Sequence, residues 1–215
     1  MKTLELFAGT KSFSKVAEKL GHDTLTVDNQ EELKPDLVGD LLEDDILQEV
    51  MKGVKWADII WMSPPCTTFS MASGNTHWTA DRQPKTVHAK NGRALLNKCK
   101  EIAEYCIEHN KIFFIENPIA RARWFLPVEW RKSVWYCQYG DTRAKPTDIW
   151  TNLKEWTPKM CKNGNPDCHH ERAPRGSKTG TQGLKGAKVR GVIPPKLFEE
   201  IFGVINERLN ESKNV

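Results

Sequence analysis

The sequence lacks any apolar run long enough to cross a membrane, and only 39% of its 215 residues are hydrophobic. A membrane-spanning helix needs about 20 consecutive apolar residues, so none is predicted. A secretory leader is also missing, because Met1 and Lys2 are followed directly by a short apolar stretch. The six cysteines are scattered and do not form a disulfide framework. These absences predict a cytoplasmic protein that does not bind a membrane.

A strong net charge and an internal repeat are absent as well. The net charge is only +4, so binding to a nucleic acid would have to come from a local basic patch. The densest basic run lies within 171–190, where Glu171 is the one acidic residue. This run predicts contacts to phosphates, and the alternative is a solvated charged loop. The candidate phosphate-binding residues are Arg172, Arg175, Lys178 and Lys185.

Short apolar runs alternate with amphipathic patterns along most of the chain. The alternation predicts an α/β fold with a mostly parallel, doubly wound sheet. Two later apolar runs, at 133–137 and 147–152, predict an antiparallel terminal hairpin joined by a turn at 140–145. We expect one main domain from 1–152 plus 189–215, and a small loop-rich segment from 153–188. The predicted helices cover 13–20, 46–51, 92–109 and 193–209.

Three predicted strands end in residues that can take part in chemistry, which are Asp28, Cys66 and Glu116. The carboxyl ends of parallel strands meet at one edge of a sheet, so we expect these side chains at the same edge. A cysteine thiolate can add to an electrophilic ring carbon while a carboxylic acid holds the adjacent ring nitrogen. The alternatives are a small buried cysteine in a turn for Cys66 and a helix cap for Asp28.

The first predicted strand is followed by small residues and then by a helix. Gly9 and its neighbours would let a ligand approach the backbone and the helix N-terminus. Asp28 ends the second strand, where an acidic residue suits the hydroxyls of a ribose. Asp40 ends the third strand. Together these positions predict a site for a cofactor that contains a nucleoside.

Four short motifs occur in an order that is also found in a known family. This sequence has L-F-A-G at 6–9, P-C-T-T-F-S at 65–70, E-N-P at 116–118 and G-V-I-P-P-K-L at 191–197. In the same order, the DNA (cytosine-5)-methyltransferases have F-A-G, P-C-Q-x-F-S, E-N-V and G-N-x-V-P-P-x-L. The sequence therefore resembles a short form of this family over most of its length outside 153–188.

The resemblance implies a Rossmann-like class I methyltransferase fold. It also implies methyl transfer from S-adenosylmethionine to carbon 5 of cytosine in DNA, through a covalent cysteine adduct. Cys66 is then the nucleophile and Glu116 its carboxylate partner, with Asp28 at the ribose and Asp40 near the adenine amino group. The residues implied for cofactor binding are Phe7, Ala8, Gly9, Thr10, Asp28, Asp40 and Pro64.

The sequence departs from the family in the motif that supplies a cation to the base. The family's Q-x-R-x-R matches poorly at 140–147. Either Arg143 or Lys145 could supply that cation, and the sequence does not choose between them.

The family's large target-recognition domain is also missing. Target recognition is therefore expected from 67–91 and 153–190, with Trp78 or Met71 filling the space left by a flipped base. Without the large domain, methylation of RNA or of a free nucleotide is an alternative function. A non-catalytic DNA-binding homologue is another.

A cluster of cysteine and histidine residues lies within 153–188. Cys161, Cys168 and one of His169 and His170 supply three possible zinc ligands, and Cys137 or the other histidine could supply a fourth. The spacing is not that of a standard zinc finger. The alternative is a polar loop in which these residues occur incidentally.

Overall fold

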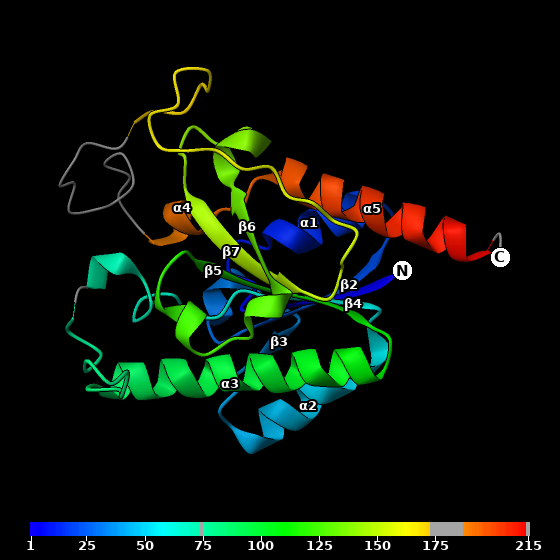
Figure 1. Cartoon of the computed structure of the whole chain (residues 1–215). Helices are drawn as coiled ribbons and strands as arrows, with labels where there is room; N and C mark the ends of the chain where they lie inside the picture. Colours follow the sequence, from blue (N-terminus) through cyan, green and yellow to red (C-terminus); the bar gives the residue numbers. More distant parts are fainter. Residues whose placement is uncertain (74, 173–186, 214–215) are drawn as a thin grey trace.

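A seven-stranded sheet forms the centre of the structure, and helices cover both of its faces (Figure 1). The computed structural model describes residues 1–73, 75–172 and 187–213. The strands are β1 (Lys2–Leu6), β2 (Asp23–Asp28), β3 (Leu37–Val38), β4 (Ile59–Met62), β5 (Ile112–Pro118), β6 (Arg131–Trp135) and β7 (Pro146–Thr151). The α-helices are α1 (Ser12–Lys19), α2 (Asp44–Trp56), α3 (Val87–Glu108), α4 (Ala187–Gly191) and α5 (Pro195–Lys213).

The strand order in the sheet is β3-β2-β1-β4-β5-β7-β6. Strands β1 to β5 are parallel, whereas β7 runs antiparallel to both β5 and β6. This arrangement confirms the predicted α/β fold, a Rossmann-like, mostly parallel doubly wound sheet with an antiparallel terminal hairpin. The order reverses between β1 and β4, and open sheets of this kind bind ligands beyond the carboxyl ends of such strands.

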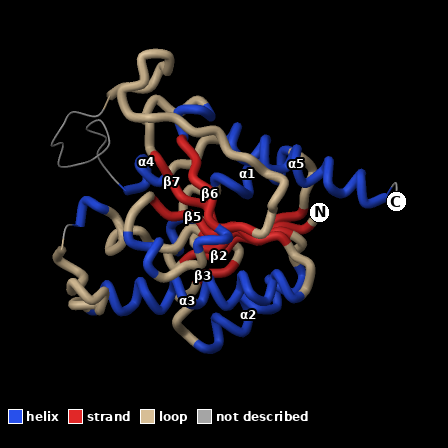
Figure 2. The backbone as a smooth tube through the Cα atoms, in the orientation of Figure 1, coloured by secondary structure: helices blue, strands red, loops and turns tan. Residues whose placement is uncertain are grey.

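Strand β4 shows how the sheet is buried on both faces. Ile60 and Met62 pack into a core formed with α2 and α3, whereas Ile59 and Trp61 pack into a second core formed with α1 and α5. Figure 2 shows the helices on either side of the strands. Neighbouring residues of a strand point to opposite faces, so burial of both faces explains why this strand is a continuous apolar run in the sequence.

Several predicted boundaries differ from the observed ones, and two of the differences have a clear local cause. The helix predicted over 92–109 begins at Val87, because the hydroxyl oxygen of Thr86 accepts a hydrogen bond of 3.2 Å from the Ala89 N–H and caps its first turn. The strand predicted over 133–137 ends at Trp135, because Tyr136–Tyr139 forms a 3-10 turn. Both differences arise from local hydrogen bonding that apolar periodicity does not report.

The segment from 153 is attached to the main core at its start. Leu153 and Trp156 are buried in the core that contains α1 and α5. The Trp135 N–H then donates to the Lys159 carbonyl at 3.2 Å, which holds the chain along β6. From 157 to 170 the chain forms neither helix nor strand. None of the helices in the described ranges is long and apolar enough to cross a bilayer.

Candidate active site

Cys66 lies on a turn that follows β4 at the carboxyl edge of the sheet. The strand stops at Met62, and two prolines follow soon after, which cannot continue a central strand. The N–H groups of Phe69 and Ser70 donate to the Cys66 carbonyl at 3.0 and 2.9 Å and close the turn. The Cys66 side chain is exposed. The turn therefore presents a thiol to a reactant that approaches this edge.

Asn117 connects this turn to the neighbouring strand. Its side-chain amide, which is fully buried near the end of β5, donates to the Pro64 carbonyl at 3.1 Å. β4 and β5 pair in parallel, with Met62 opposite Ile115. The contact therefore fixes the start of the cysteine turn relative to the end of β5, where Glu116 lies.

Glu116 is buried on β5, and its hydrogen-bond partner is Tyr136, in the 3-10 turn that follows β6. The Tyr136 hydroxyl donates to Glu116 Oε1 at 3.0 Å. Burial raises the pKa of the Glu116 carboxyl, whereas the nearby Lys145 and the Tyr136 hydrogen bond lower it. Because burial is the largest of these effects, the carboxyl retains its proton at a higher pH than an exposed glutamate does.

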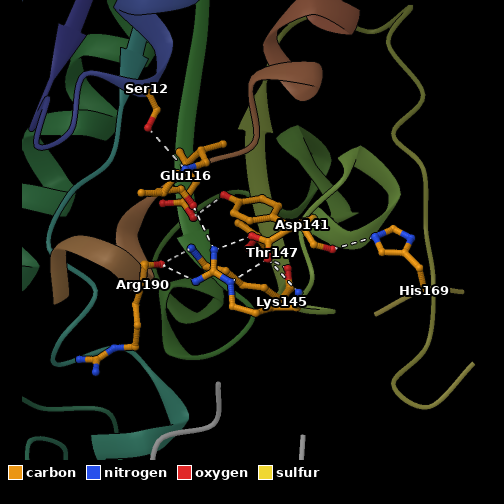
Figure 3. Close-up of polar contacts among 11 residues, drawn as sticks. Ser12, Glu116, Asp141, Lys145, Thr147, His169 and Arg190 are labelled. Carbon is orange, nitrogen blue, oxygen red and sulfur yellow. Dashed lines mark hydrogen bonds and ion pairs between the residues drawn. The ribbon is translucent and has the colours of Figure 1, made fainter. Parts of the chain in front are cut away.

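Lys145 supplies the positive charge next to this pair. Its Nζ donates to the Arg190 carbonyl at 2.8 Å and lies 4.6 Å from the centre of the Tyr136 ring. Figure 3 shows Lys145 beneath Glu116, with the Arg190 backbone on its other side. Burial lowers the pKa of Lys145, whereas the negative charges of Glu116 and Cys66 raise it. The ammonium group is thus electrostatically linked to both candidate catalytic residues.

Arg143 has a different environment, although it lies only two residues from Lys145. Its guanidinium group forms an ion pair with Asp141, with contacts of 2.5 and 2.8 Å, and it also donates to the Arg190 carbonyl at 3.3 Å. The side chain is almost fully buried. Arg143 therefore holds the turn between β6 and β7, and Lys145 is the cation that the structure brings to Glu116 and Cys66.

The pKa of the Cys66 thiol is raised above its ordinary value. Loss of solvation among the surrounding residues is the largest cause, and the charge of Glu116 raises it further. Lys145 and Arg190 act in the opposite direction, because positive charge stabilises a thiolate. The free protein therefore holds Cys66 mainly as a thiol near neutral pH, and the nucleophilic form depends on these two cations.

The loop between β1 and α1 has an unusual backbone. Phe7, Gly9 and Lys11 all have positive φ angles, of 57°, 49° and 55°. Only glycine adopts this conformation without strain, and strained residues of this kind concentrate at functional sites. The Gly9 N–H donates to Asp28 Oδ2 at 2.8 Å, and the Gln30 N–H donates to Oδ1 at 3.0 Å. Asp28 thus holds this loop as well as ending β2.

Two cavities lie beside these strand ends. The smaller, of about 40 Å³, is lined by Phe7, Asp28 and Asp40 together with apolar side chains. The larger, of about 370 Å³, shares Asp40, Pro65 and Leu95 with it. Pro65 lines both cavities, whereas the predicted Pro64 is buried. The two neighbouring cavities, with their carboxylates and apolar walls, form the candidate site for a nucleoside.

The remaining predicted cofactor residues, Ala8 and Thr10, shape the loop. The Ala8 N–H donates to the Val27 carbonyl at 3.0 Å, and the Thr10 hydroxyl lies 2.8 Å from Ser12 Oγ. Ser12 Oγ in turn accepts from the Ile193 N–H at 3.4 Å (Figure 3). The closing G-V-I-P-P motif is thereby attached to the first motif, although 181 positions separate the two residues.

The loop after Cys66 contains a buried aromatic anchor. Trp78 is 3% exposed, its Nε1 donates to the Thr68 carbonyl at 2.7 Å, and its ring stacks on Phe69. Met71, by contrast, is 72% exposed. Of the two residues predicted to fill the space of a flipped base, Met71 is the accessible one in this structure.

The cysteine and histidine residues converge, and of the predicted alternatives the structure brings together the set with Cys137 as the fourth residue. Cys161, Cys168 and His170 come together with Cys137, and their ligand atoms all lie within 4.8 Å of one another. His169 lies outside this group, because its Nε2 contacts the Asp141 carbonyl at 3.1 Å (Figure 3).

Of the predicted basic residues, Arg172 is exposed. Arg175, Lys178 and Lys185 lie outside the described residues.

Sequence reasoning did not assign a role to three residues that the structure brings to the site, nor to one buried carboxylate on the central strand β1. Tyr136 and Arg190 come from segments without a matching motif, and their roles depend on how the hairpin and α4 pack. A role for Asn117 could have been predicted, because it stands in the E-N-P motif and the carbonyl groups of a proline-rich turn need hydrogen-bond partners. Glu5 is buried on β1 and accepts hydrogen bonds from Ser14. A charged residue inside an apolar strand is the signal that marks it.

No model of a known protein family matches the sequence. A probable DNA (cytosine-5)-methyltransferase of Frog virus 3 (isolate Goorha) is 30% identical over 219 residues, which cover 94% of this chain and 99% of the viral protein. Among solved structures, a DNMT2 mutant from Spodoptera frugiperda is 18% identical with a TM-score of 0.41, over 80% of this chain and 57% of its own. The S. pombe Dnmt2 methyltransferase is 12% identical with a TM-score of 0.41, over 70% and 48%. The chain thus spans about half the length of these two solved proteins.

Proposed function

The chain belongs to the DNA (cytosine-5)-methyltransferase family, and on this basis we propose that it methylates carbon 5 of cytosine in DNA through a covalent adduct with Cys66. One observation carries the proposal for this chain's own residues. Cys66, Glu116 and Lys145 come from three different parts of the sequence and are electrostatically coupled at one edge of the sheet. A nucleophile, a buried acid and a cation form the set that addition to a ring carbon requires.

In the proposed reaction, Cys66 Sγ as thiolate forms a bond to carbon 6 of the cytosine ring. The electron pair displaced from the 5,6 double bond makes carbon 5 nucleophilic. S-adenosylmethionine, when bound, supplies the methyl group to that carbon. A base then removes the proton from carbon 5, and the thiolate leaves carbon 6, which restores the ring and frees Cys66.

Glu116 and Lys145 have complementary roles in this proposal. The raised pKa of Glu116 favours the carboxylic acid, which can donate a hydrogen bond to ring nitrogen 3 and offset the charge that develops on addition. Lys145 lowers the pKa of Cys66 and contacts the base as a cation. Tyr136 holds the Glu116 carboxyl in position through its hydroxyl.

The residues around the smaller cavity have the chemical character that S-adenosylmethionine binding requires. Asp28 and Asp40 supply acceptors, and Phe7 and Leu95 supply apolar walls for a flat ring. Each Asp28 oxygen already accepts one backbone N–H. A carboxylate oxygen has a second lone pair, so both can also accept from ribose hydroxyls. The predicted zinc would be a structural ion outside this site, with no part in methyl transfer.

DNA is the substrate that we propose, and residues 67–91 and 153–190 are its proposed reader. The exposed Met71 on the first segment and Arg172 on the second support this assignment. A reader of this size makes few base contacts, so the recognised site should be short, roughly two to four base pairs. RNA or a free nucleotide is the alternative substrate that a small reader also allows.

A methyl-transfer assay with labelled S-adenosylmethionine on duplex DNA, RNA and free nucleotides tests the proposal. We expect incorporation into cytosine of duplex DNA, and loss of incorporation by orders of magnitude in Cys66→Ser, because a hydroxyl is far less ionised than a thiol near neutral pH. DNA that contains 5-fluorocytosine should trap wild-type protein covalently, since fluorine at carbon 5 prevents release.

Calorimetry with S-adenosylmethionine is the control for these variants, because Cys66→Ser should retain cofactor binding. Wild-type turnover in Cys66→Ser would exclude the covalent mechanism. Incorporation into RNA or nucleotides without incorporation into DNA would show that the substrate is not DNA. Absence of incorporation into all three, with intact cofactor binding, would favour the non-catalytic DNA-binding homologue.

A further inference from the structure

We propose that Cys137, Cys161, Cys168 and His170 bind one structural zinc ion that fastens residues 157–172 to the turn that carries Lys145. The four ligand atoms lie within 4.8 Å of one another. In a tetrahedral zinc site, bonds of about 2.0 to 2.3 Å place neighbouring ligand atoms roughly 3.5 to 3.8 Å apart. Closing the cluster on an ion therefore needs side-chain movements on the order of 1 Å.

The donor set favours zinc over harder cations. Three thiolates and one imidazole are soft or borderline ligands, which suit zinc and do not suit magnesium, calcium or manganese. Four protein ligands leave no open coordination position, which is the pattern of a structural rather than a catalytic site. A disulfide would use only two of the three cysteines and would leave the third sulfur and the histidine without a role.

Side-chain amides around the cluster also suit metal-bound sulfur. Asn165 Nδ2 donates to Cys161 Sγ at 3.5 Å, and Gln138 Nε2 donates to Cys168 Sγ at 3.4 Å. Such N–H groups stabilise thiolate charge, and groups of this kind orient metal ligands and tune their affinity.

His170 shows what metal binding would change. Its Nε2 accepts a hydrogen bond of 3.0 Å from the Gly164 N–H, and its Nδ1 lies 4.0 Å from Cys161 Sγ. A metal on Nε2 would use that lone pair, and a metal on Nδ1 would move the ring proton to Nε2. In both cases the ring can no longer accept from Gly164, so the loop at 163–165 must rearrange when the ion binds.

The segment needs a stabilising element of this kind. Within 161–170 only His170 is buried, and the chain there forms no regular structure. A segment with so little apolar burial cannot offset the entropy of ordering it, and metals commonly supply the missing free energy in small loop-rich units.

The cluster is linked to the turn before β7 by two contacts and by the chain itself. The Glu171 N–H donates to the Thr142 carbonyl at 2.8 Å, His169 Nε2 contacts the Asp141 carbonyl at 3.1 Å, and Cys137 itself lies in the 3-10 turn after β6. Asp141 holds Arg143, and Lys145 follows two residues later. Zinc would therefore fix the position of Lys145. This link to the active site rests on the proposed function, whereas zinc binding does not.

Metal analysis of the full chain, purified under reducing conditions with zinc supplied, tests the site. We expect about one zinc per chain, and cobalt(II) substitution should give the absorption of a tetrahedral site with sulfur ligands. Cys137→Ser and Cys168→Ser should each lose the ion. His169→Gln, the neighbour outside the cluster, and Cys66→Ser, the exposed thiol at the other site, should each keep it.

Gln138→Ala adds a graded variant, since loss of an outer contact should weaken zinc affinity about ten- to a hundredfold. S-adenosylmethionine binding by calorimetry shows that each variant is folded. If Cys137→Ser does not bind S-adenosylmethionine, the zinc content of Cys168→Ser is used to test the site. Removal of zinc from wild-type protein should move the alkylation of Cys66 to higher pH, because Lys145 is no longer held beside it.

Several results would overturn the assignment. These are wild-type protein without stoichiometric zinc after reconstitution, iron or copper bound instead, or unchanged zinc in Cys168→Ser. The proposed methyl transfer can fail independently, because Cys66→Ser abolishes it while leaving zinc in place.

Discussion

The Asn117 side-chain amide donates to the Pro64 carbonyl at 3.1 Å, so a single buried side chain joins the two strand ends that carry Cys66 and Glu116. We expect Asn117→Ala to lower kcat by about one to two orders of magnitude, because a nucleophile displaced by a fraction of an ångström loses its alignment. It should also destabilise the fold by roughly 1 to 3 kcal/mol.

Asn152→Ala is the matched control for this variant. Its amide also bridges two backbone groups, the Phe113 N–H at 3.2 Å and the Lys111 carbonyl at 2.8 Å, but at the opposite end of β5. We expect a similar loss of stability in urea unfolding with kcat unchanged. Equal losses of activity in the two variants would show that Asn117 acts only on stability.

The reactivity of Cys66 should respond in opposite directions to its two charged neighbours. Lys145→Met removes a positive charge that lowers the Cys66 pKa, so the midpoint of Cys66 alkylation should rise by on the order of one pH unit. Glu116→Gln removes a negative charge that raises the pKa, so its midpoint should fall. Peptide mapping after iodoacetamide treatment measures this at Cys66 alone, and Lys19→Met, a substitution at an exposed position of α1, serves as control. Shifts of the same sign in both variants would contradict the electrostatic account.

Cofactor affinity should depend on Asp28 and Asp40. We expect Asp28→Ala and Asp40→Ala each to weaken S-adenosylmethionine binding by roughly 1.5 to 3 kcal/mol, the usual value of a hydrogen bond to a charged group. Asp36→Ala is the control, because Asp36 also accepts from the β2 backbone, at Thr26, but does not line either cavity. Unchanged S-adenosylmethionine affinity in Asp28→Ala would show that the cofactor does not bind at Asp28.

Glu5 should make stability depend on pH. Burial raises its pKa from 4.5 to about 7, although hydrogen bonds from Ser14 and Phe13 oppose the shift. The folded state thus binds the proton more tightly than the unfolded state, so this group stabilises the fold below pH 4.5 and loses that contribution as the pH rises to about 7. The loss amounts to about 3 kcal/mol.

Urea unfolding of wild-type and Glu5→Gln protein at pH 5 and pH 8 measures this contribution. The free energy of unfolding of the variant minus that of wild type should be larger at pH 8 than at pH 5 by about 2 to 3 kcal/mol, because wild-type stability falls as Glu5 ionises. The same difference at both pH values would show that Glu5 does not titrate in this range.

Affinity for DNA should depend strongly on salt through the basic run in 171–190. Neutralising Arg172, Arg175, Lys178 and Lys185 together should reduce the slope of log K against log salt by roughly 3 to 4, if each contacts one phosphate. The reduction should be similar on all DNA sequences, because phosphate contacts do not read bases. Full affinity in the quadruple variant would show that these residues form only a solvated surface.

The strand ends of the site could be predicted, because an apolar run followed by proline defines where a buried strand stops. Cys66 and Glu116 were placed at strand ends in this way, and Asp28 was placed at the end of a short apolar stretch without a proline after it. The choice between Arg143 and Lys145 could not, because they are two residues apart in one turn, and only the Asp141 ion pair decides which faces the site. The choice between Cys137 and the second histidine as fourth residue of the cluster could not be made either, because Cys137 reaches Cys161 through the path of the hairpin and not through local spacing. Trp78 looked available in a polar loop, but Phe69 and Phe125 enclose it.

The segment between 153 and 193 leaves and rejoins one and the same core. Leu153 and Trp156, at the start of the segment, are buried in this core, and so are Ile193 and Leu197 at its end. Loop closure entropy rises slowly, by about 0.6 kcal/mol for each doubling of loop length. A longer or shorter reader can therefore be exchanged at this position while the sheet, the cysteine turn and the cofactor loop stay as they are. We therefore expect that exchanging this insertion changes only the part of target recognition that it carries, while the proposed reader at 67–91 and the strand ends with Cys66 and Glu116 stay in place.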